Sequence, residues 1–344
     1  TLSTSSAASD VYKRQALAGA ITLSNLVSGE ALNHSGTATI SSANAGSYTI
    51  TNLSGISIAD GSGGTASNYT LTGGTHNFTV NRRAVSVSGT RLYDATTNAV
   101  ASDLSTHANL VGSETLNLSG TGTIASKNVG SNKTVSVGTL ALADGSNGGL
   151  AANYTLSGGT HQLTVNQRPL NATLARQYDG TTTAAGSTLS SFDALQGGET
   201  LTMTGSGTAA SANVANGIAM SSNGTLALAD GTGLASNYSL NSTVINIAQR
   251  VLNSSGSKTY DANTDALAGA ITLSNLVSGE ALNHSGTATI GSANAGSYTI
   301  TNLSGISIAD GSGGTASNYT LTGGTHNFTV NRRAVSVSGT RLYD

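Results

Sequence analysis

The side chains that could carry chemistry in this chain are copies of a few types at regular spacing. Tyr-Asp pairs recur at intervals of 85, 82 and 83 residues, and Asn-Tyr pairs, Asp-Gly pairs and single Glu residues recur with them. The markers are Tyr93-Asp94, Tyr178-Asp179, Tyr260-Asp261 and Tyr343-Asp344; Asn68-Tyr69, Asn153-Tyr154, Asn237-Tyr238 and Asn318-Tyr319; Asp60-Gly61, Asp144-Gly145, Asp230-Gly231 and Asp310-Gly311; and Glu30, Glu114, Glu199 and Glu280. Paired carboxylates can hydrolyse glycosidic bonds. Here the acids are spread along the chain and recur with the repeat, which argues against such a site.

The Asp-Gly stretches are the best place to test for a cation. Calcium takes six to eight oxygen ligands, usually with several carboxylates. The stretch from Ala143 to Gly149 offers one Asp beside neutral Ser and Asn residues. Glu114 or Asp179 could complete a site only from elsewhere in the chain. We expect plain hairpin turns, with calcium binding left open as the alternative.

Histidine and serine give no stronger signal. His76, His161 and His326 each close a Gly-Gly-Thr-His string, and His34 and His284 occupy one copied position. The chain has no His-x-His or His-Glu-x-x-His spacing, and no nucleophile elbow in a strand-to-helix context. Because Cys is absent, thiolate catalysis, disulfides and Cys-bound zinc are excluded. We therefore assign no catalytic, cofactor-binding or metal-binding residue and no cofactor, and expect a protein that is not an enzyme.

The recurring pairs have a structural interpretation instead. In the Tyr-Asp pairs, the Asp can accept backbone N–H groups in an Asx-turn. The Tyr can offer its ring to a core that lacks Trp, with its hydroxyl at the rim. For the Asn-Tyr pairs, we expect the Asn to cap a turn before a strand. Ligand stacking on the tyrosines is the functional alternative.

The elements that position these residues are predicted to be strands. Ile56 and Ile58, and Leu140 and Leu142, alternate with small residues before an Asp-Gly turn. Gly-containing turn signals succeed one another every 8–12 residues. The prediction is an all-β fold of small antiparallel β-sandwich-like modules, about 83 residues each, stacked as an elongated rod. A β-grasp-like module is the alternative and would require a helix.

The repeat sets the domain boundaries. Residues 266–344 copy residues 16–94 with one difference, Gly291 in place of Ser41. We predict a partial module at 16–83, full modules at 84–168, 169–250 and 251–333, and the start of a further module at 334–344. Residues 1–15 depart from the repeat and are interpreted as an atypical segment, not native to it. Both ends are expected to be cut from a longer chain.

Composition removes further classes of function. The chain carries 14 basic and 16 acidic residues, a formal net charge of −2, so it lacks the basic surface typical of nucleic-acid binding. Its apolar runs are shorter than the ~18 residues that suggest a membrane span. With no Trp and three Phe, its cores are expected to be thin and aliphatic.

The motifs Lys258-Thr259-Tyr260-Asp261, Gln177-Tyr178-Asp179-Gly180, Asn128-Val129-Gly130 and Asn153-Tyr154-Thr155-Leu156 together resemble the YDG repeat modules of large bacterial secreted adhesins. These are exoproteins of the filamentous-haemagglutinin type, exported by two-partner secretion. Ala95 and Ala262 stand where the motif has Gly. The resemblance covers residues 16–344 and implies an extracellular or cell-surface array of β modules that crosses an outer-membrane transporter during export.

The expected function is therefore a structural or adhesive stalk segment without catalysis. Two alternatives stay open. The modules could themselves bind surface glycans or proteins of a host or neighbouring cell, gaining strength by multivalency. They could also be accessory repeats of a carbohydrate-active enzyme.

Overall fold

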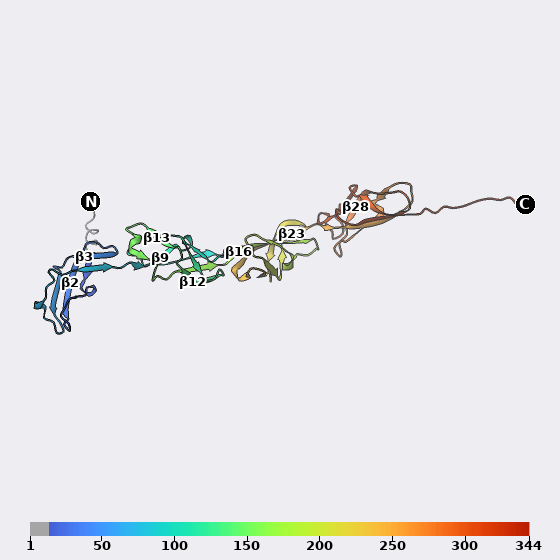
Figure 1. Ribbon diagram of the computed structural model, residues 1–344. Helices are drawn as coiled ribbons and strands as arrows, with labels where there is room; N and C mark the ends of the chain where they lie inside the picture. The colour runs from blue at the N-terminus through green and yellow to red at the C-terminus, as the bar shows by residue number, and fades with distance from the viewer. Residues whose placement is uncertain (1–13, 344) are drawn as a thin grey trace, which may run out of the picture. The chain divides into compact units, whose positions relative to one another are not determined.

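The computed structural model describes residues 14–343, which form two compact units that divide between Asn166 and Gln167. For reference, the repeats 16–83, 84–168, 169–250 and 251–333 are called modules A, B, C and D. The first unit holds module A and ends two residues before the predicted end of module B. The second unit holds modules C and D and the segment after them (Figure 1).

Every module is built from short strands and single turns of 3₁₀ helix, labelled η. Module A and the link to module B contain β1 (Gln15–Leu17), η1 (Ala18–Ala20), β2 (Leu32–Ile40), β3 (Gly46–Asn52), β4 (Ile56–Asp60), η2 (Ala66–Asn68), β5 (Asn77–Val80) and β6 (Arg83–Ala84). Module B contains β7 (Ser86–Leu92), β8 (Asn98–Val100), η3 (Ala101–Asp103), β9 (Thr106–Ala108), β10 (Leu116–Ser119), β11 (Thr121–Ile124), β12 (Gly130–Ser136), β13 (Ala141–Asp144), η4 (Ala151–Asn153), β14 (Tyr154–Thr155) and β15 (Gln162–Asn166).

The second unit repeats this order. Module C contains β16 (Arg168–Gln177), β17 (Thr183–Ala185), η5 (Gly186–Thr188), β18 (Leu189–Phe192), β19 (Leu201–Thr204), β20 (Ser206–Ala209), β21 (Ala215–Ser222), β22 (Ala227–Asp230), η6 (Ala235–Asn237) and β23 (Tyr238–Ala248). Module D with its link contains β24 (Arg250–Val251), β25 (Asn253–Thr259), β26 (Asp265–Leu267), η7 (Ala268–Ala270), β27 (Ile271–Ser274), β28 (Asn283–Ile290), β29 (Gly296–Asn302), β30 (Ile306–Ala309), η8 (Ala316–Asn318), β31 (Tyr319–Thr320) and β32 (His326–Asn331).

The main sheet has the same strand order in modules B, C and D. The orders are β8-β11-β12-β15-β7-β9, β17-β20-β21-β23-β16-β18 and β26-β28-β29-β32-β25-β27. In each case the first long strand of the module lies beside its last strand, and these two run parallel. The longest such pair, β16 with β23, extends from Arg168–Tyr238 to Gln177–Ala248. One pair of strands therefore closes a module of about 80 residues.

Module A has a shorter sheet, with the order β1-β2-β3-β5 and β4 paired to β2. Strand β5 pairs with β3 and is the last strand of the sheet among the described residues. The counterpart of β25 would fall at residues 3–9, which lie outside the described residues. The predicted atypical segment 1–15 also lies mostly outside them.

Alternating burial explains why these segments are strands. In β16, Leu170, Ala172 and Leu174 are at most 1% exposed, and polar residues lie between them. The cores of modules A and D are mostly Ala, Ile and Val, as the lack of Trp predicts. The backbone polar groups are satisfied across the ladders, so such thin cores suffice to hold the sheets.

The prediction of small all-β modules is confirmed. Among residues 14–343 the helical segments are single 3₁₀ turns, so the helix that a β-grasp module needs is absent from this part of the chain. None of these helical segments is long and apolar enough to cross a bilayer. The parallel pair in the main sheet of modules B, C and D departs from the antiparallel pairing that short turns predict, because the rest of the module lies between its two strands.

Close packing around β25, the first long strand of module D, allows the role of one glycine to be tested. A Cβ built at Gly256 in β25 would lie 2.3 Å from the carbonyl oxygen of Ala270 and 2.7 Å from the ring of Phe328, whereas Gly269 has open space. We expect Gly256→Ala to lower the free energy of unfolding by roughly 1–3 kcal/mol. Gly269→Ala, in the same module, is the control. Urea unfolding followed by circular dichroism measures both, and equal midpoints would contradict the packing argument.

Candidate functional site

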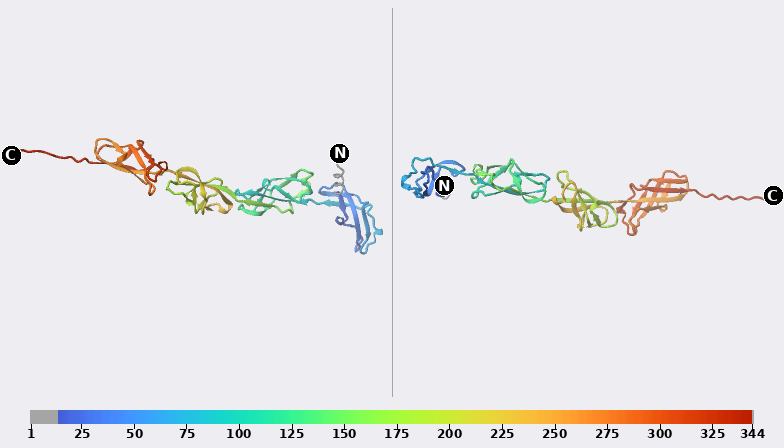
Figure 2. Two further views of the ribbon diagram at one scale, coloured as in Figure 1. Left: turned by 180° about the vertical axis from the view of Figure 1, so that it is seen from behind. Right: turned by 60° about the horizontal axis from the view of Figure 1, so that its bottom comes forward.

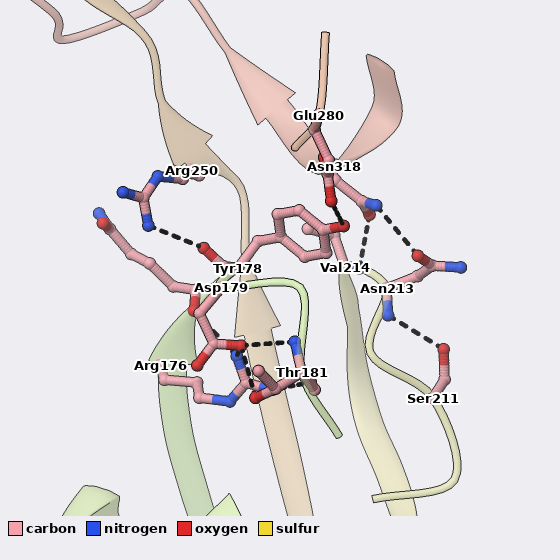
Figure 3. Close-up of polar contacts among 11 residues, drawn as sticks. Arg176, Tyr178, Asp179, Thr181, Ser211, Asn213, Val214, Arg250, Glu280 and Asn318 are labelled. Carbon is pink, nitrogen blue, oxygen red and sulfur yellow. Dashed lines mark hydrogen bonds and ion pairs between the residues drawn. The ribbon is translucent and has the colours of Figure 1, made fainter. Parts of the chain in front are cut away.

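Three kinds of recurring side chain meet at the junction of modules C and D: the Tyr of a Tyr-Asp pair, the recurring Glu, and an Asn-Tyr pair. The parallel strands β16 and β23 end side by side. Just beyond their last pair, the N–H of Tyr178 donates to the carbonyl oxygen of Ala248 at 2.9 Å. That bond places Tyr178 just beyond the end of β16, against module D (Figure 3). The end of a module's first strand is thus a contact surface for its neighbour.

Glu280 of module D binds two tyrosine hydroxyls, one from each module. The Tyr178 hydroxyl donates to its Oε1 at 2.6 Å, and the Tyr319 hydroxyl donates to its Oε2 at 2.6 Å. The two rings meet edge to face, with centroids 5.4 Å apart. The Tyr319 hydroxyl also accepts the N–H of Val277 at 3.0 Å. We call Tyr178, Glu280 and Tyr319 the tyrosine–glutamate clasp.

The clasp keeps its phenols neutral. Burial, together with the hydrogen bond to Glu280, raises the pKa of Tyr319 to about 12. The same two causes raise the pKa of Tyr178. Both side chains are almost wholly buried. Phenols with raised pKa values keep their protons and donate hydrogen bonds to the carboxylate, so the clasp has the properties of a structural contact and not of an acid–base site.

Asn318 forms a second link between modules C and D. Its Oδ1 accepts the N–H of Val214 at 2.9 Å, and its Nδ2 donates to Oδ1 of Asn213 at 3.0 Å. Both partners belong to module C, and Asn318 is 1% exposed (Figure 3). Because this amide both accepts and donates, it fixes the orientation of module D against module C as well as the distance between them.

The linking backbone is itself part of a sheet. Strand β24 pairs in parallel with β31, and the N–H of Leu252 donates to the carbonyl oxygen of Thr320 at 2.8 Å. Arg250 donates through Nε to the carbonyl oxygen of Asn275 at 2.6 Å. Its Nη1 donates to the carbonyl oxygen of Tyr178 at 3.4 Å. The link between the modules is therefore an ordered strand.

Apolar packing crosses this junction as well. Tyr178 and Tyr319 belong to the same buried cluster as Leu174, Ile247 and Leu252. Because Leu252 and Tyr319 come from module D, the cores of modules C and D meet in one continuous cluster. Bending at this point would expose apolar surface, which costs about 25 cal/mol per Å².

The junction of modules A and B has the same links on the side of module B. Asn153 accepts the N–H of Ala45 at 2.8 Å and donates to Oδ1 of Asn44 at 3.0 Å. The Tyr154 hydroxyl donates to Oε2 of Glu114 at 2.5 Å. Burial and this bond raise the pKa of Tyr154. The repeated contacts show that the junction recurs with the repeat and is not a feature of one copy.

This first junction also has a cavity of about 610 Å³. Val80, Asn81 and Arg83 line it from module A, and Val111, Glu114 and Tyr154 line it from module B. In the second unit, the counterparts Val277, Glu280 and Tyr319 surround Tyr178. The cavity therefore occupies the place that Tyr178 fills between modules C and D.

In the Tyr-Asp pairs within residues 14–343 the Asp holds its own turn, so the predicted Asx-turn is confirmed for them. Asp344 lies outside the described residues. Oδ1 of Asp179 accepts both the N–H and the hydroxyl of Thr181 at 2.9 Å, and Asp179 also pairs with Arg176. In module D, the bond from Lys258 Nζ at 2.9 Å lowers the pKa of Asp261. Gly180 has φ of +77°, and Ala262 takes the same left-handed conformation at +66°, so the turn keeps its shape where the motif lacks Gly.

The predictions for the tyrosine hydroxyl and for the Asn were wrong at Tyr178, Asn153 and Asn318. The hydroxyl of Tyr178 does not end at a solvent rim but bonds Glu280 of the next module. The side chains of Asn153 and Asn318 do not cap their own turns but bond the preceding module. The recurring Glu, which the sequence suggested only as a possible outside ligand for calcium, is the acceptor at the centre of the clasp. Its constant spacing from the Asn-Tyr pair was the available signal.

The Asp-Gly loops are closed by their own aspartates. Oδ1 of Asp144 accepts the N–H of Ala151 at 2.8 Å, and its carbonyl oxygen accepts Nδ2 of Asn117 at 2.7 Å. The other three aspartates accept the N–H of the first η residue in the same way, at 2.7 Å. Within residues 14–343, no three His, Asp or Glu side chains gather as metal ligands would.

The Gly-Gly-Thr-His histidines tie turns to strands. In His161, Nε2 lies 2.8 Å from the carbonyl oxygen of Leu156, and Nδ1 accepts the N–H of Val87 at 3.3 Å. These backbone partners assign the neutral tautomer with its proton on Nε2. His326 repeats the arrangement with Leu321 and the hydroxyl of Ser254. Both rings hold structure.

The Asn link can be tested with a matched control, because modules A and D are nearly identical. Asn318 is buried at the C–D junction, whereas its copy Asn68 is exposed. We expect Asn318→Ala to lower the free energy of unfolding by about 1–3 kcal/mol, since it leaves buried partners unpaired. Asn68→Ala should change it by less than about 0.5 kcal/mol. Urea unfolding of the full chain measures both, and equal effects would contradict the assignment.

The clasp predicts a late step in the alkaline titration. Tyr319 has a folded-state pKa of about 12, above its ordinary value of 10.0. The stability that it contributes is therefore complete below pH 10 and is lost as the pH rises through about 12. Because the chain lacks Trp, absorbance at the tyrosinate band reports this step directly. Tyr319→Phe should remove the last step and Tyr298→Phe should leave it; identical curves would contradict the clasp.

Comparison with known proteins gives this architecture a family. The model of the YDG domain matches three successive segments, residues 77–162, 162–245 and 248–326. A search of the curated proteins finds no match. The three segments together cover more than half of the chain, and each contains one Asn-Tyr pair and one recurring Glu. The chain belongs to the YDG domain family, as a tandem array of its repeats.

Proposed function

We propose that this chain is a spacer segment of an exported bacterial surface protein, in which modules A and B, and modules C and D, hold each other in a fixed orientation within their units. The observation that carries the proposal is the tyrosine–glutamate clasp with Asn318 beside it. Three hydrogen bonds of these side chains join modules C and D: one from Tyr178 to Glu280 and two at Asn318. The bond from Tyr319 to Glu280 lies within module D and holds the carboxylate in place. A flexible linker would need none of them.

The chemistry of the recurring residues supports a mechanical role. The carboxylate of Glu280 is held by two phenols, Asp179 by its own turn, and His161 by backbone groups. These three groups are occupied in holding the shape of the modules. The work of such a chain is to transmit position and force from one module to the next.

Export and location are part of the same proposal. The resemblance to repeats of secreted adhesins supports an extracellular or cell-surface location reached through an outer-membrane transporter. A Cys-free chain of low charge suits passage in an unfolded state, because no disulfide can form on the way. Glycans or proteins of a host or neighbouring cell are then the partners of the complete protein.

Pulling the full chain by its ends tests the spacer function. We expect separate unfolding events, each releasing one module of about 83 residues, or roughly 28 nm of contour length at ~3.4 Å per residue. Glu280→Ala should lower the force of the event that parts modules C and D, and its copy Glu30→Ala is the control. A single featureless extension, or no difference between the two variants, would contradict the role.

A glycan array probed with the same chain tests the adhesive alternative. A spacer should show no saturable binding above a denatured control. Saturable binding that weakens in shorter arrays would replace the spacer by a multivalent receptor-binding function.

A further inference from the structure

Two histidines lie on either side of one buried residue in module B. Strand β9 places His107 opposite Val87 of β7, and the N–H of Val87 donates to Nδ1 of His161 at 3.3 Å. Val87 is fully buried, and His161 is 6% exposed. We call His107, Val87 and His161 the histidine row. It lies at the start of the parallel pairing of β7 with β15, which closes this module, drawn in cyan to green in both views of Figure 2.

The same row has other residues in modules C and D. The corresponding residues, in the same order, are Phe192, Ala172 and Thr243 in module C, and Leu273, Ser254 and His326 in module D. Residues 169–250, which make up module C, contain no histidine at all. Of these three modules, module B is the one with a histidine at both ends of the row.

The surroundings of both rings in module B require a neutral imidazole. Nδ1 of His161 faces the N–H of Val87, which can only donate, so a proton on Nδ1 removes this bond. Nε2 of His107 is buried and has no hydrogen-bond partner among residues 14–343. An imidazolium carries a proton on both nitrogens, so protonated His107 would bury an N–H without an acceptor, which is costly.

Module D shows surroundings in which a histidine tolerates a proton. Nδ1 of His326 lies 2.9 Å from the hydroxyl of Ser254, which can accept a hydrogen bond as well as donate one. Nε2 of His284 lies 3.0 Å and 2.9 Å from the carbonyl oxygens of Ala268 and Ile271. Because these oxygens accept, the contacts remain when either ring is protonated. The partners of each histidine, and not the number of histidines, therefore distinguish module B from module D.

Charged side chains around the histidine row are engaged elsewhere. Those on the elements packed around it are Arg91 of β7, Asp103 of η3, Glu114 before β10 and Lys133 of β12. Arg91 pairs with Asp94, and the carboxylate of Glu114 accepts the hydroxyl of Tyr154 at 2.5 Å. Burial lowers the pKa of His107, and only the backbone of Leu116 acts in the opposite direction. Within residues 14–343, no carboxylate thus acts on His107 to favour its protonated form.

We infer that the histidine row makes module B an acid-sensitive switch, which opens as the pH falls below neutrality while module C stays closed. Burial holds the folded-state pKa of His107 below its ordinary value of 6.5. Below 6.5 the unfolded chain therefore takes up a proton that the folded module excludes, so the stability of module B is complete above that pH and falls below it. Each excluded proton raises the unfolding equilibrium constant by up to about tenfold per pH unit. The inference does not depend on the proposed spacer function.

Hydrogen exchange of the full chain, followed by mass spectrometry of peptides from each module, tests the switch. Between pH ~7.5 and ~5, after correction for the intrinsic exchange rate, the protection of β7 and β15 should fall roughly tenfold relative to that of β16 and β23. His107→Leu gives module B the residue of module D and should retain most of that protection. His284→Leu is the matched control: it makes the same change outside the row, where module B has Leu118, and should leave the acid response of module B unchanged.

The reverse substitution keeps the test decisive if His107→Leu does not fold. Phe192→His places a histidine in the row of module C and should make the protection of β16 and β23 fall in acid. Equal protection of module B at both pH values, an equal loss in modules B and C, or an unchanged acid loss in His107→Leu would each overturn the inference. So would a Phe192→His chain whose module C keeps its full protection in acid.

Discussion

The parallel pairing of a module's first and last long strands is the constraint on which the rest of the structure depends. In module C it joins β16 to β23 across ten residue pairs, with one shift of register. The pair closes the sheet, buries Leu174 beside Ile245 and Ile247, and delivers the Tyr-Asp turn to the next module. Because the last strand continues into the link, the same pairing sets where the next module begins.

The tyrosine–glutamate clasp makes the contact between modules C and D specific. Glu280 is half-buried, and a carboxylate there needs donors to replace lost water. It takes one phenol from its own module and one from the preceding module. Sliding or turning one module against the other would cost the carboxylate a donor. Apolar packing of Tyr178 alone would hold the modules together, but it would fix their orientation less closely, because dispersion has little direction.

Local features of this fold could be predicted from the sequence, and contacts between distant residues could not. Alternation around Leu140 and Leu142 indicated strands, and Asp179 was predicted to hold its own turn, as it does. The partner of β16 lies about 70 residues away, and no pattern within either strand encodes which strand it meets. The bond from Asn318 to Val214 spans 104 residues and joins two copies of the repeat. A repeated residue indicates a role in every copy of the module. It does not show whether that residue contacts its own module or the neighbouring one.

Because modules A and D are nearly identical in sequence, comparing them shows how much of the burial of a residue depends on neighbouring segments. Their residues from 16 to 83 and from 266 to 333 differ at one position, yet Phe78 and Tyr69 are half-buried where Phe328 and Tyr319 are buried. The difference cannot arise from propensity or local pattern, which are the same in both. In module D, β25 covers the ring of Phe328, and Tyr178 of module C packs on Tyr319. Part of the core of module D is therefore supplied by its own first strand and by the preceding module, outside the residues that it shares with module A.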